Sequence, residues 1–425
     1  MALTIESLPI ELLAQILSGL DGIGTLKCAV TSVPTLLAAY HEYTSQILTS
    51  VLAAEIGSDL LQDALMIELL DRQVKWTRYG PPMATWEVRN LLENWNTFSD
   101  VKWDSSLALA ASKRHRYIHK LTCRLGNSSL ERMSTISERP MGPPSPAEEL
   151  RLHRALYRFE MYWILLLSDD AQKRHVGSDL EAWAPVFFQR FAPWENEELG
   201  CVLDFLYQIL LPGMLLCFAV LTGSTTDYRI AFNDLAFHDI LWGAYGVEYA
   251  ENMNNTYVRR LITRGLEGIL AITEAEDYES RLRELGSVPP DGNFFVLKDA
   301  WENYGRSRTL LDEYAIIFHD DPDNERQETW DHCLINWLGL VDDVAVRPLR
   351  AFCYISWDYS RLEVLGLFDP WIDTLNDWRA HPEKWNDYLL AHKRPMRDLV
   401  WSSNQRARLY RQGVRGYWAS PEVRA

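Results

Sequence analysis

The chain has 425 residues, of which 47% are hydrophobic and 24% are charged, and this balance excludes a disordered or collagen-like protein. Its 17 tryptophans supply a large apolar surface to bury, and a chain of this length can build its core without disulfides or structural metals. The formal net charge of −17 argues against a broad basic face that could bind phosphates. We therefore expect neither nucleic acid nor a membrane as a partner.

The cysteines and the N-terminus point to a reducing compartment. No two cysteines have Cys-x-x-Cys spacing, which favours free thiols over a disulfide framework or a zinc site. The first six residues include Glu6 and lack the basic region of a secretory signal. These features predict a cytoplasmic or nuclear protein. The cysteines are Cys28, Cys123, Cys201, Cys217, Cys333 and Cys353.

Residues 7–40 predict three short helices at the N-terminus. Pro9 presets the backbone for the start of the first helix, and Gly19 and Gly22 flank its end. The second helix is expected over 25–31 and the third over 34–40. An apolar stripe of the first helix either docks on the rest of the chain or is reserved for another protein. That stripe consists of Leu12, Leu13, Ile16, Leu17 and Leu20.

A helix is predicted to begin at Pro146, because Ser145 and Glu148 have the spacing of a capping box. Just before it, residues 126–147 are rich in Gly, Ser and Pro, and we expect an exposed linker there. The predicted organisation is an N-terminal helical motif over 1–45, a helical extension over 46–125, this linker, and a C-terminal helical domain over 148–425. The apolar stripe of the helix after Pro146 is Leu152, Leu156, Phe159, Trp163 and Leu166.

Later segments keep the fold class all-α. Residues 205–221 are almost entirely apolar, but Pro212-Gly213 interrupts them, so we expect two buried helices rather than a membrane span. Residues 293–297 form the one plausible short strand. Residues 391–425 carry eight basic side chains, which either dock a terminal helix on an acidic body or contact a partner.

The search for catalytic motifs gives no candidate. The chain has no P-loop, no Gly-x-Ser-x-Gly elbow and no His-Glu-x-x-His sequence. His115 and His119 share a helix face, but the surrounding lysine and arginines would repel a metal ion, so a solvated basic face is the expectation. The acidic run 319–325 lacks the glycine and the closing glutamate of a calcium loop. We predict no catalytic residue, no metal ligand and no cofactor.

The N-terminal helices contain a recognisable pattern. It runs Leu8-Pro9-x-Glu11-Leu12-x-x-x-Ile16-Leu17-x-x-Leu20, then a turn, then Leu26-x-x-x-Val30. This pattern resembles an F-box, and together with segments 47–57, 188–199 and 357–367 it is similar to the large group of F-box-like proteins expanded in filamentous fungi. The resemblance implies that these helices bind the Skp adaptor of a cullin–RING ubiquitin ligase. The implied adaptor-binding residues are Leu8, Pro9, Ile10, Leu12, Leu13, Ile16, Leu17, Leu20, Leu26 and Val30.

The resemblance also implies the function. It predicts an N-terminal three-helix F-box-like motif followed by a large irregular helical domain, and a non-catalytic substrate receptor that reaches cullin through the adaptor. The C-terminal domain would recruit a protein substrate whose identity the pattern does not give. Two alternatives remain open. One is a stand-alone helical interaction protein whose N-terminal stripe packs on its own body, and the other is an all-α enzyme with a pocket in the Trp-rich body.

Overall fold

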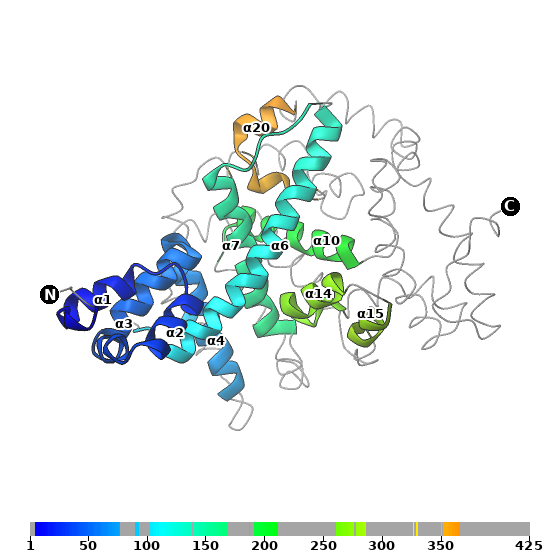
Figure 1. The fold of residues 1–425 in the computed structure, drawn as a ribbon. Helices are drawn as coiled ribbons and strands as arrows, with labels where there is room; N and C mark the ends of the chain where they lie inside the picture. The colour runs from blue at the N-terminus through cyan, green and yellow to red at the C-terminus, as the bar shows by residue number, and fades with distance from the viewer. Residues whose placement is uncertain are drawn as a thin grey trace, which may run out of the picture. The chain divides into compact units, whose positions relative to one another are not determined.

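A computed structural model describes residues 5–76, 90–92, 102–137, 139–167, 187, 191–210, 261–275, 278–285, 326, 329, 350 and 352–365. Within these ranges every regular element is a helix, which confirms the all-α prediction (Figure 1). None of the helices described is long and apolar enough to cross a membrane. The second predicted buried helix after Pro212, the short strand at 293–297, the acidic run 319–325 and the basic segment 391–425 lie outside the described residues.

The chain forms two compact units, and the first contains most of the described helices. Its described residues fall within 5–127 and 144–199, whereas those of the second unit fall within 128–143, 200–285 and 326–365. Residues 144–199 thus belong with the N-terminal helices, so the units do not follow the predicted boundary at 148.

The three predicted N-terminal helices are present and pack together (Figure 1). Both α1 and α2 lie against α3, which runs past the predicted end at residue 40 and bends at Tyr43, whose φ of −114° and ψ of 26° are not helical. The predicted domain boundary at 45 therefore falls inside this helix. The elements are η1 (Ile5–Ser7), α1 (Ile10–Ser18), α2 (Ile23–Ser32) and α3 (Pro34–Ile56).

One carboxylate fixes the start of α2. Gly22 occupies the N-cap position and has no side chain to cap the helix. Glu55, near the end of α3, supplies the missing acceptor, because its Oε2 accepts a hydrogen bond of 2.9 Å from the backbone N–H of Ile23. The Ser112 hydroxyl donates to Oε1 of the same carboxylate over 2.6 Å. Glu55 therefore links α2 and α3 to a residue of the later helix α6 (Ser105–Ser137).

Further helical elements of the first unit pack around α7 (Pro146–Tyr162). η2 (Ser58–Leu60) leads into α4 (Leu61–Trp76), and both pack against α7, which continues into the π-helical turn η5 (Trp163–Leu167). α6 (Ser105–Ser137) and α10 (Pro193–Leu210) begin in this unit and end in the second.

The predicted capping box at the start of α7 is confirmed. The Ser145 hydroxyl accepts from the backbone N–H of Glu148 over 3.2 Å, and the Glu148 carboxylate accepts from the backbone N–H of Ser145 over 2.7 Å. The helix is buried on more than its apolar stripe, because charged residues are enclosed with it. These buried ionisable residues are Glu148, Arg151, His153, Arg158 and Glu160.

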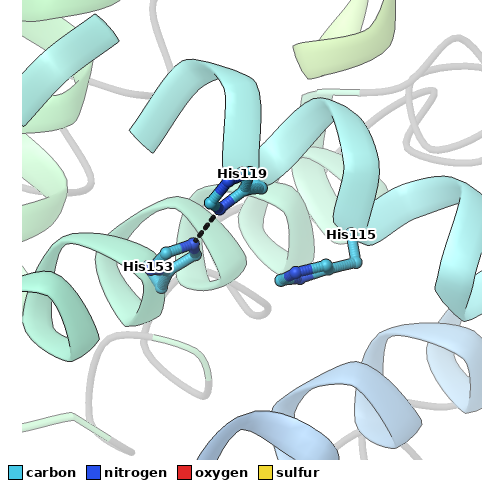
Figure 2. A group of neighbouring side chains, drawn as sticks. All are labelled: His115, His119 and His153. Carbon is cyan, nitrogen blue, oxygen red and sulfur yellow. Dashed lines mark hydrogen bonds between the residues drawn. The ribbon is translucent and has the colours of Figure 1, made fainter. Parts of the chain in front are cut away.

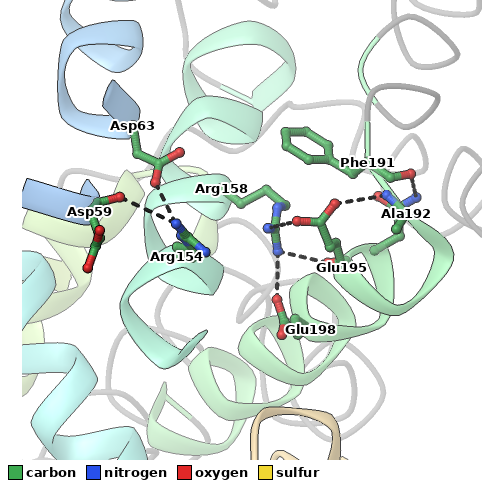
Figure 3. A network of polar contacts seen from close by, with 9 residues as sticks. Asp59, Asp63, Arg154, Arg158, Phe191, Ala192, Glu195 and Glu198 are labelled. Carbon is green, nitrogen blue, oxygen red and sulfur yellow. Dashed lines mark hydrogen bonds and ion pairs between the residues drawn. The ribbon is translucent and has the colours of Figure 1, made fainter. Parts of the chain in front are cut away.

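Arg158 joins α7 to the start of α10 (Figure 3). Its guanidinium donates to Glu195 over 2.6 Å and to Glu198 over 2.8 Å, and it lies 4.8 Å from the ring centre of Phe191. Glu195 also accepts from the backbone N–H of Ala192 over 2.9 Å, so it caps α10 as well. The acidic side chains in the first turn of α10 thus have two effects. They interact favourably with the helix dipole, and they neutralise a buried arginine.

The predicted linker is wrong over its first half, because α6 continues to Ser137. Gly126 and Ser129 are buried within that helix, and packing overrides their weak helix preference. Of the described residues in the predicted linker, only 139–145 are non-helical. Their backbone is held in place, since Arg361 donates to the carbonyls of Gly142 and Pro143 over 3.0 and 2.8 Å.

The described helices of the second unit are short. α14 (Gly265–Glu274) packs against α15 (Tyr278–Leu285), while η7 (Tyr354–Ser356) precedes α20 (Tyr359–Val364). Trp357 is 1% exposed, and its indole N–H donates to the Phe352 carbonyl over 2.6 Å. This tryptophan is therefore a core residue of the second unit.

Candidate functional site

The surface with the clearest functional character is a row of apolar side chains on α1 and the turn before it. Ile5, Leu12 and Ile16 are 41%, 43% and 44% exposed, and Pro9 between them is also exposed. Leu12 and Ile16 are four residues apart and share one face of α1, and Ile5 and Pro9 precede the helix. We call these four residues the α1 stripe. Single exposed apolar side chains are ordinary, but a group of them is typical of an interaction surface.

The opposite side of α1 builds the local core. Leu13, Ala14 and Leu17 are at most 3% exposed, and α1 packs on α3. The helix begins after Pro9, whose carbonyl accepts from the N–H groups of Leu12 and Leu13, and it ends at Gly19 without a left-handed residue. The backbone is thus held by packing on one face while the other face stays in water.

The structure divides the ten residues of the F-box-like pattern into three groups. Pro9, Leu12 and Ile16 are exposed and available to a partner. Leu13, Leu17 and Leu26 are buried in the three-helix core, where they shape the surface without reaching it. The half-buried residues between these groups are Leu8, Ile10, Leu20 and Val30. Ile5, which the pattern omitted, extends the exposed row.

A second candidate feature is a cluster of polar residues that lies between α4, α6 and α7. Arg114 donates to Glu68 and Glu160 over 2.7 Å each and to Asp71 over 3.1 Å. Tyr117 donates to the same oxygen of Glu160 over 2.7 Å. The basic run around residue 114 was predicted to be a solvated face, but for Arg114 that prediction is wrong. Three carboxylates surround its guanidinium, and burial of this ionic cluster holds the three helices together.

His115, the next residue, is also buried, so the solvated-face prediction is wrong for it as well. Its Nδ1 lies 2.9 Å from the Tyr157 hydroxyl. Burial is the main cause that lowers its pKa, the neighbouring histidines 153 and 119 add to this, and the pKa falls to about 4. His115 is therefore neutral at physiological pH.

Two more histidines complete a cluster with His115 (Figure 2). His119 is exposed and lies one turn along α6, while His153 on α7 is 5% exposed. His119 Nδ1 and His153 Nε2 are 3.1 Å apart, and one ring nitrogen of each of the three residues lies within 4.8 Å of the others. Burial lowers the pKa of His153 despite the opposing hydrogen bond to the Glu149 carbonyl.

Sequence reasoning found two members of this cluster and missed the third. His115 and His119 are four residues apart, a spacing that marks one helix face. His153 lies 34 residues beyond His119, on a helix whose pairing with α6 no local pattern specifies. The one available signal was its position between Leu152 and Leu156 on a helix predicted to be buried.

Comparison of the chain with known protein families, with characterised proteins and with solved structures finds no match.

Proposed function

We propose that this chain is the substrate-receptor subunit of a Skp–cullin–F-box type ubiquitin ligase, acting in the cytoplasm or nucleus. The α1 stripe would contact the Skp adaptor, and the adaptor would connect the chain to cullin. The helical body beyond the N-terminal helices would recruit the protein to be ubiquitinated. In this proposal the chain carries out no chemistry itself.

The observation that supports the proposal best is the exposure of Leu12 and Ile16 on a helix that is otherwise firmly packed. Each loses favourable burial while it faces water, at roughly 25 cal/mol for every Å² of apolar surface. A binding partner that covers the stripe would recover that free energy. In the alternative of a stand-alone module, the body would cover these two side chains, and their exposed fractions of 43% and 44% favour the adaptor proposal.

The shape of the three-helix group also supports adaptor binding. Leu17 and Leu26 are buried and α1 and α2 share α3 as a base, so the exposed row is presented by a fixed scaffold. A rigid surface loses little conformational freedom on binding, which favours affinity. Glu11 and Gln15 are exposed next to the row and would form a polar rim around its apolar centre.

The direct test uses purified full-length chain and a recombinant Skp-type adaptor. The double substitution Leu12→Asp, Ile16→Asp puts two charges on the stripe, and we expect the affinity for the adaptor to fall at least tenfold. Val364→Asp is the matched control, because Val364 is 63% exposed on α20, outside the three-helix motif. Failure of the unaltered chain to bind, or equal losses in the variant and the control, would contradict the proposal.

A second experiment tests the ligase assignment. The tagged chain and the double variant are purified from cells with and without proteasome inhibition, and co-purifying proteins are identified by mass spectrometry. We expect the adaptor and cullin with the unaltered chain only. Substrates should accumulate with it when the proteasome is inhibited. Recovery of the adaptor without cullin would separate adaptor binding from ligase function.

A further inference from the structure

We propose that His115, His119 and His153 form a binding site for one divalent transition-metal ion of the zinc class, which joins α6 to α7. The proposal departs from the sequence-based expectation of no metal ligand. It does not depend on adaptor binding, since the three histidines lie outside the N-terminal three-helix group. Its argument starts from the separation of the ring nitrogens and continues with their hydrogen-bond partners and the surrounding charge.

The distances suit a small ion with nitrogen ligands. In a tetrahedral zinc site with Zn–N bonds of about 2.05 Å, neighbouring ligand nitrogens are about 3.3 Å apart. His119 Nδ1 and His153 Nε2, at 3.1 Å, already have this separation. The nitrogen of His115 lies within 4.8 Å of both, and a small rotation of its ring would bring it into the coordination sphere. The rings come from two helices and gather around one point (Figure 2).

While no ion is bound, His119 Nδ1 pairs with Nε2 of His153, and the hydrogen bonds fix the tautomer of His153. Its Nδ1 lies 2.9 Å from the backbone carbonyl of Glu149, which can only accept, so Nδ1 carries the proton. The other nitrogen, Nε2, then presents a lone pair toward His119. A ligating histidine that donates its second N–H to a backbone carbonyl is the usual arrangement in metal sites, because the bond fixes the ring and its tautomer.

The other two histidines have comparable supports. His115 Nδ1 pairs with the Tyr157 hydroxyl over 2.9 Å, which leaves its Nε2 for a ligand. His119 Nε2 lies 3.7 Å from Cys123 Sγ, so Nδ1 can face the ion while Nε2–H points to sulfur. In each of the three rings one nitrogen thus has a protein partner outside the cluster, and the other nitrogen is the candidate ligand atom.

The electrostatic objection from the sequence does not hold in the folded chain. Arg114, one of the two arginines that flank His115 in the sequence, is paired with Glu68, Asp71 and Glu160, and the other, Arg116, is exposed. A cation bound by neutral imidazoles is therefore not opposed by an unpaired charge on Arg114.

The test measures zinc binding to full-length chain that has first been stripped with a chelator. We expect binding by the unaltered chain, and an affinity at least tenfold lower for His119→Gln. His119 is exposed, so this variant should fold normally. His41→Gln is the matched control, because His41 is exposed on α3, and it should bind as the unaltered chain does. Equal zinc affinities for the two variants would overturn the site.

Two further readouts test the site without a measurement of zinc affinity. Cobalt(II) in place of zinc should give the visible absorption of a tetrahedral complex, and His119→Gln should lack it. Added zinc should raise the unfolding temperature of the unaltered chain and of His41→Gln, but not of His119→Gln, since a ligand that binds only the folded state stabilises it. An unaltered chain with neither signal would refute the proposal.

Discussion

The N-terminal helices and the α6–α7 junction break the usual rule of burial in opposite directions. On α1, large apolar side chains such as Leu12 and Ile16 remain in water. At the junction, Arg114, His115 and Glu160 are removed from it. Both arrangements carry a free-energy cost, because apolar surface is best buried and charge is best solvated. A binding partner would reduce the cost of the exposed row, whereas the buried charges are paired within the chain.

The largest effect is expected from breaking the buried ionic cluster. Arg114→Leu leaves Glu68, Asp71 and Glu160 without their cation, and loss of one partner of a buried ion pair costs about 3–5 kcal/mol. Urea unfolding of the purified chain measures the loss. Arg116→Leu, an exposed residue of the same helix, is the control and should change the unfolding free energy by less than about 0.5 kcal/mol. Similar losses of unfolding free energy for the two variants would show that the cluster contributes no more to stability than an exposed arginine does.

Substitutions at two neighbouring residues distinguish the buried face of α1 from its exposed face. Leu17 is fully buried, so Leu17→Ala should lower the unfolding free energy by about 2–5 kcal/mol. Ile16 is 44% exposed, and Ile16→Ala should leave stability within about 0.5 kcal/mol. The same Ile16 variant should weaken adaptor binding. If Ile16→Ala destabilised the chain as much as Leu17→Ala, the stripe would be part of the core rather than a free surface.

An exposed ion pair provides a small effect and a reference for the buried cluster. Asp104 caps α6 by accepting from the N–H groups of Ser106 and Leu107 over 2.8 Å, and it pairs with Arg72 over 3.1 Å. Both partners of that pair are about half exposed. Asp104→Ala should cost about 1 kcal/mol, the usual value of a helix cap. A loss as large as that of Arg114→Leu would remove the contrast between exposed and buried pairs.

The same residue gives a pH dependence of known sign. Partial burial alone would raise the pKa of Asp104, but hydrogen bonds from Arg72, Leu107 and Ser106 outweigh it and lower the pKa to about 2. Because the folded pKa is below the ordinary value of 3.8, this carboxylate stabilises the fold above about pH 4. The contribution is lost as the pH falls toward 2. Asp104→Asn should flatten that part of the stability profile, by less than about 1 kcal/mol for so exposed a pair.

The features predicted correctly from the sequence are those decided by residues close together in the chain. Ser145 and Glu148 are three residues apart, and their capping box formed as expected. In such cases the backbone groups to be satisfied lie within one turn of the side chains that satisfy them, so no tertiary contact is needed.

The features that sequence reasoning missed depend on distant contacts. Arg114 meets Glu160 across 46 positions, and His119 meets His153 across 34, so neither pairing leaves a local pattern. The linker prediction failed for a related reason. Gly126 and Ser129 lower helix propensity, but their burial along α6 outweighs that weak preference. The apolar stripe of the first helix was visible as periodicity, but only the fold showed that Leu12 and Ile16 face water whereas Leu13 and Leu17 are buried.

The position of Glu55 determines whether the N-terminal motif can be transferred to another protein. A fragment cut at the predicted boundary, residue 45, would omit Glu55 and leave the first N–H of α2 without its acceptor. A fragment that continues to Gly57 would keep this bond but lose the Ser112 hydroxyl that orients the carboxylate. The motif and its host are therefore not interchangeable parts. Grafting it onto another protein would require a new second hydrogen-bond donor for Glu55.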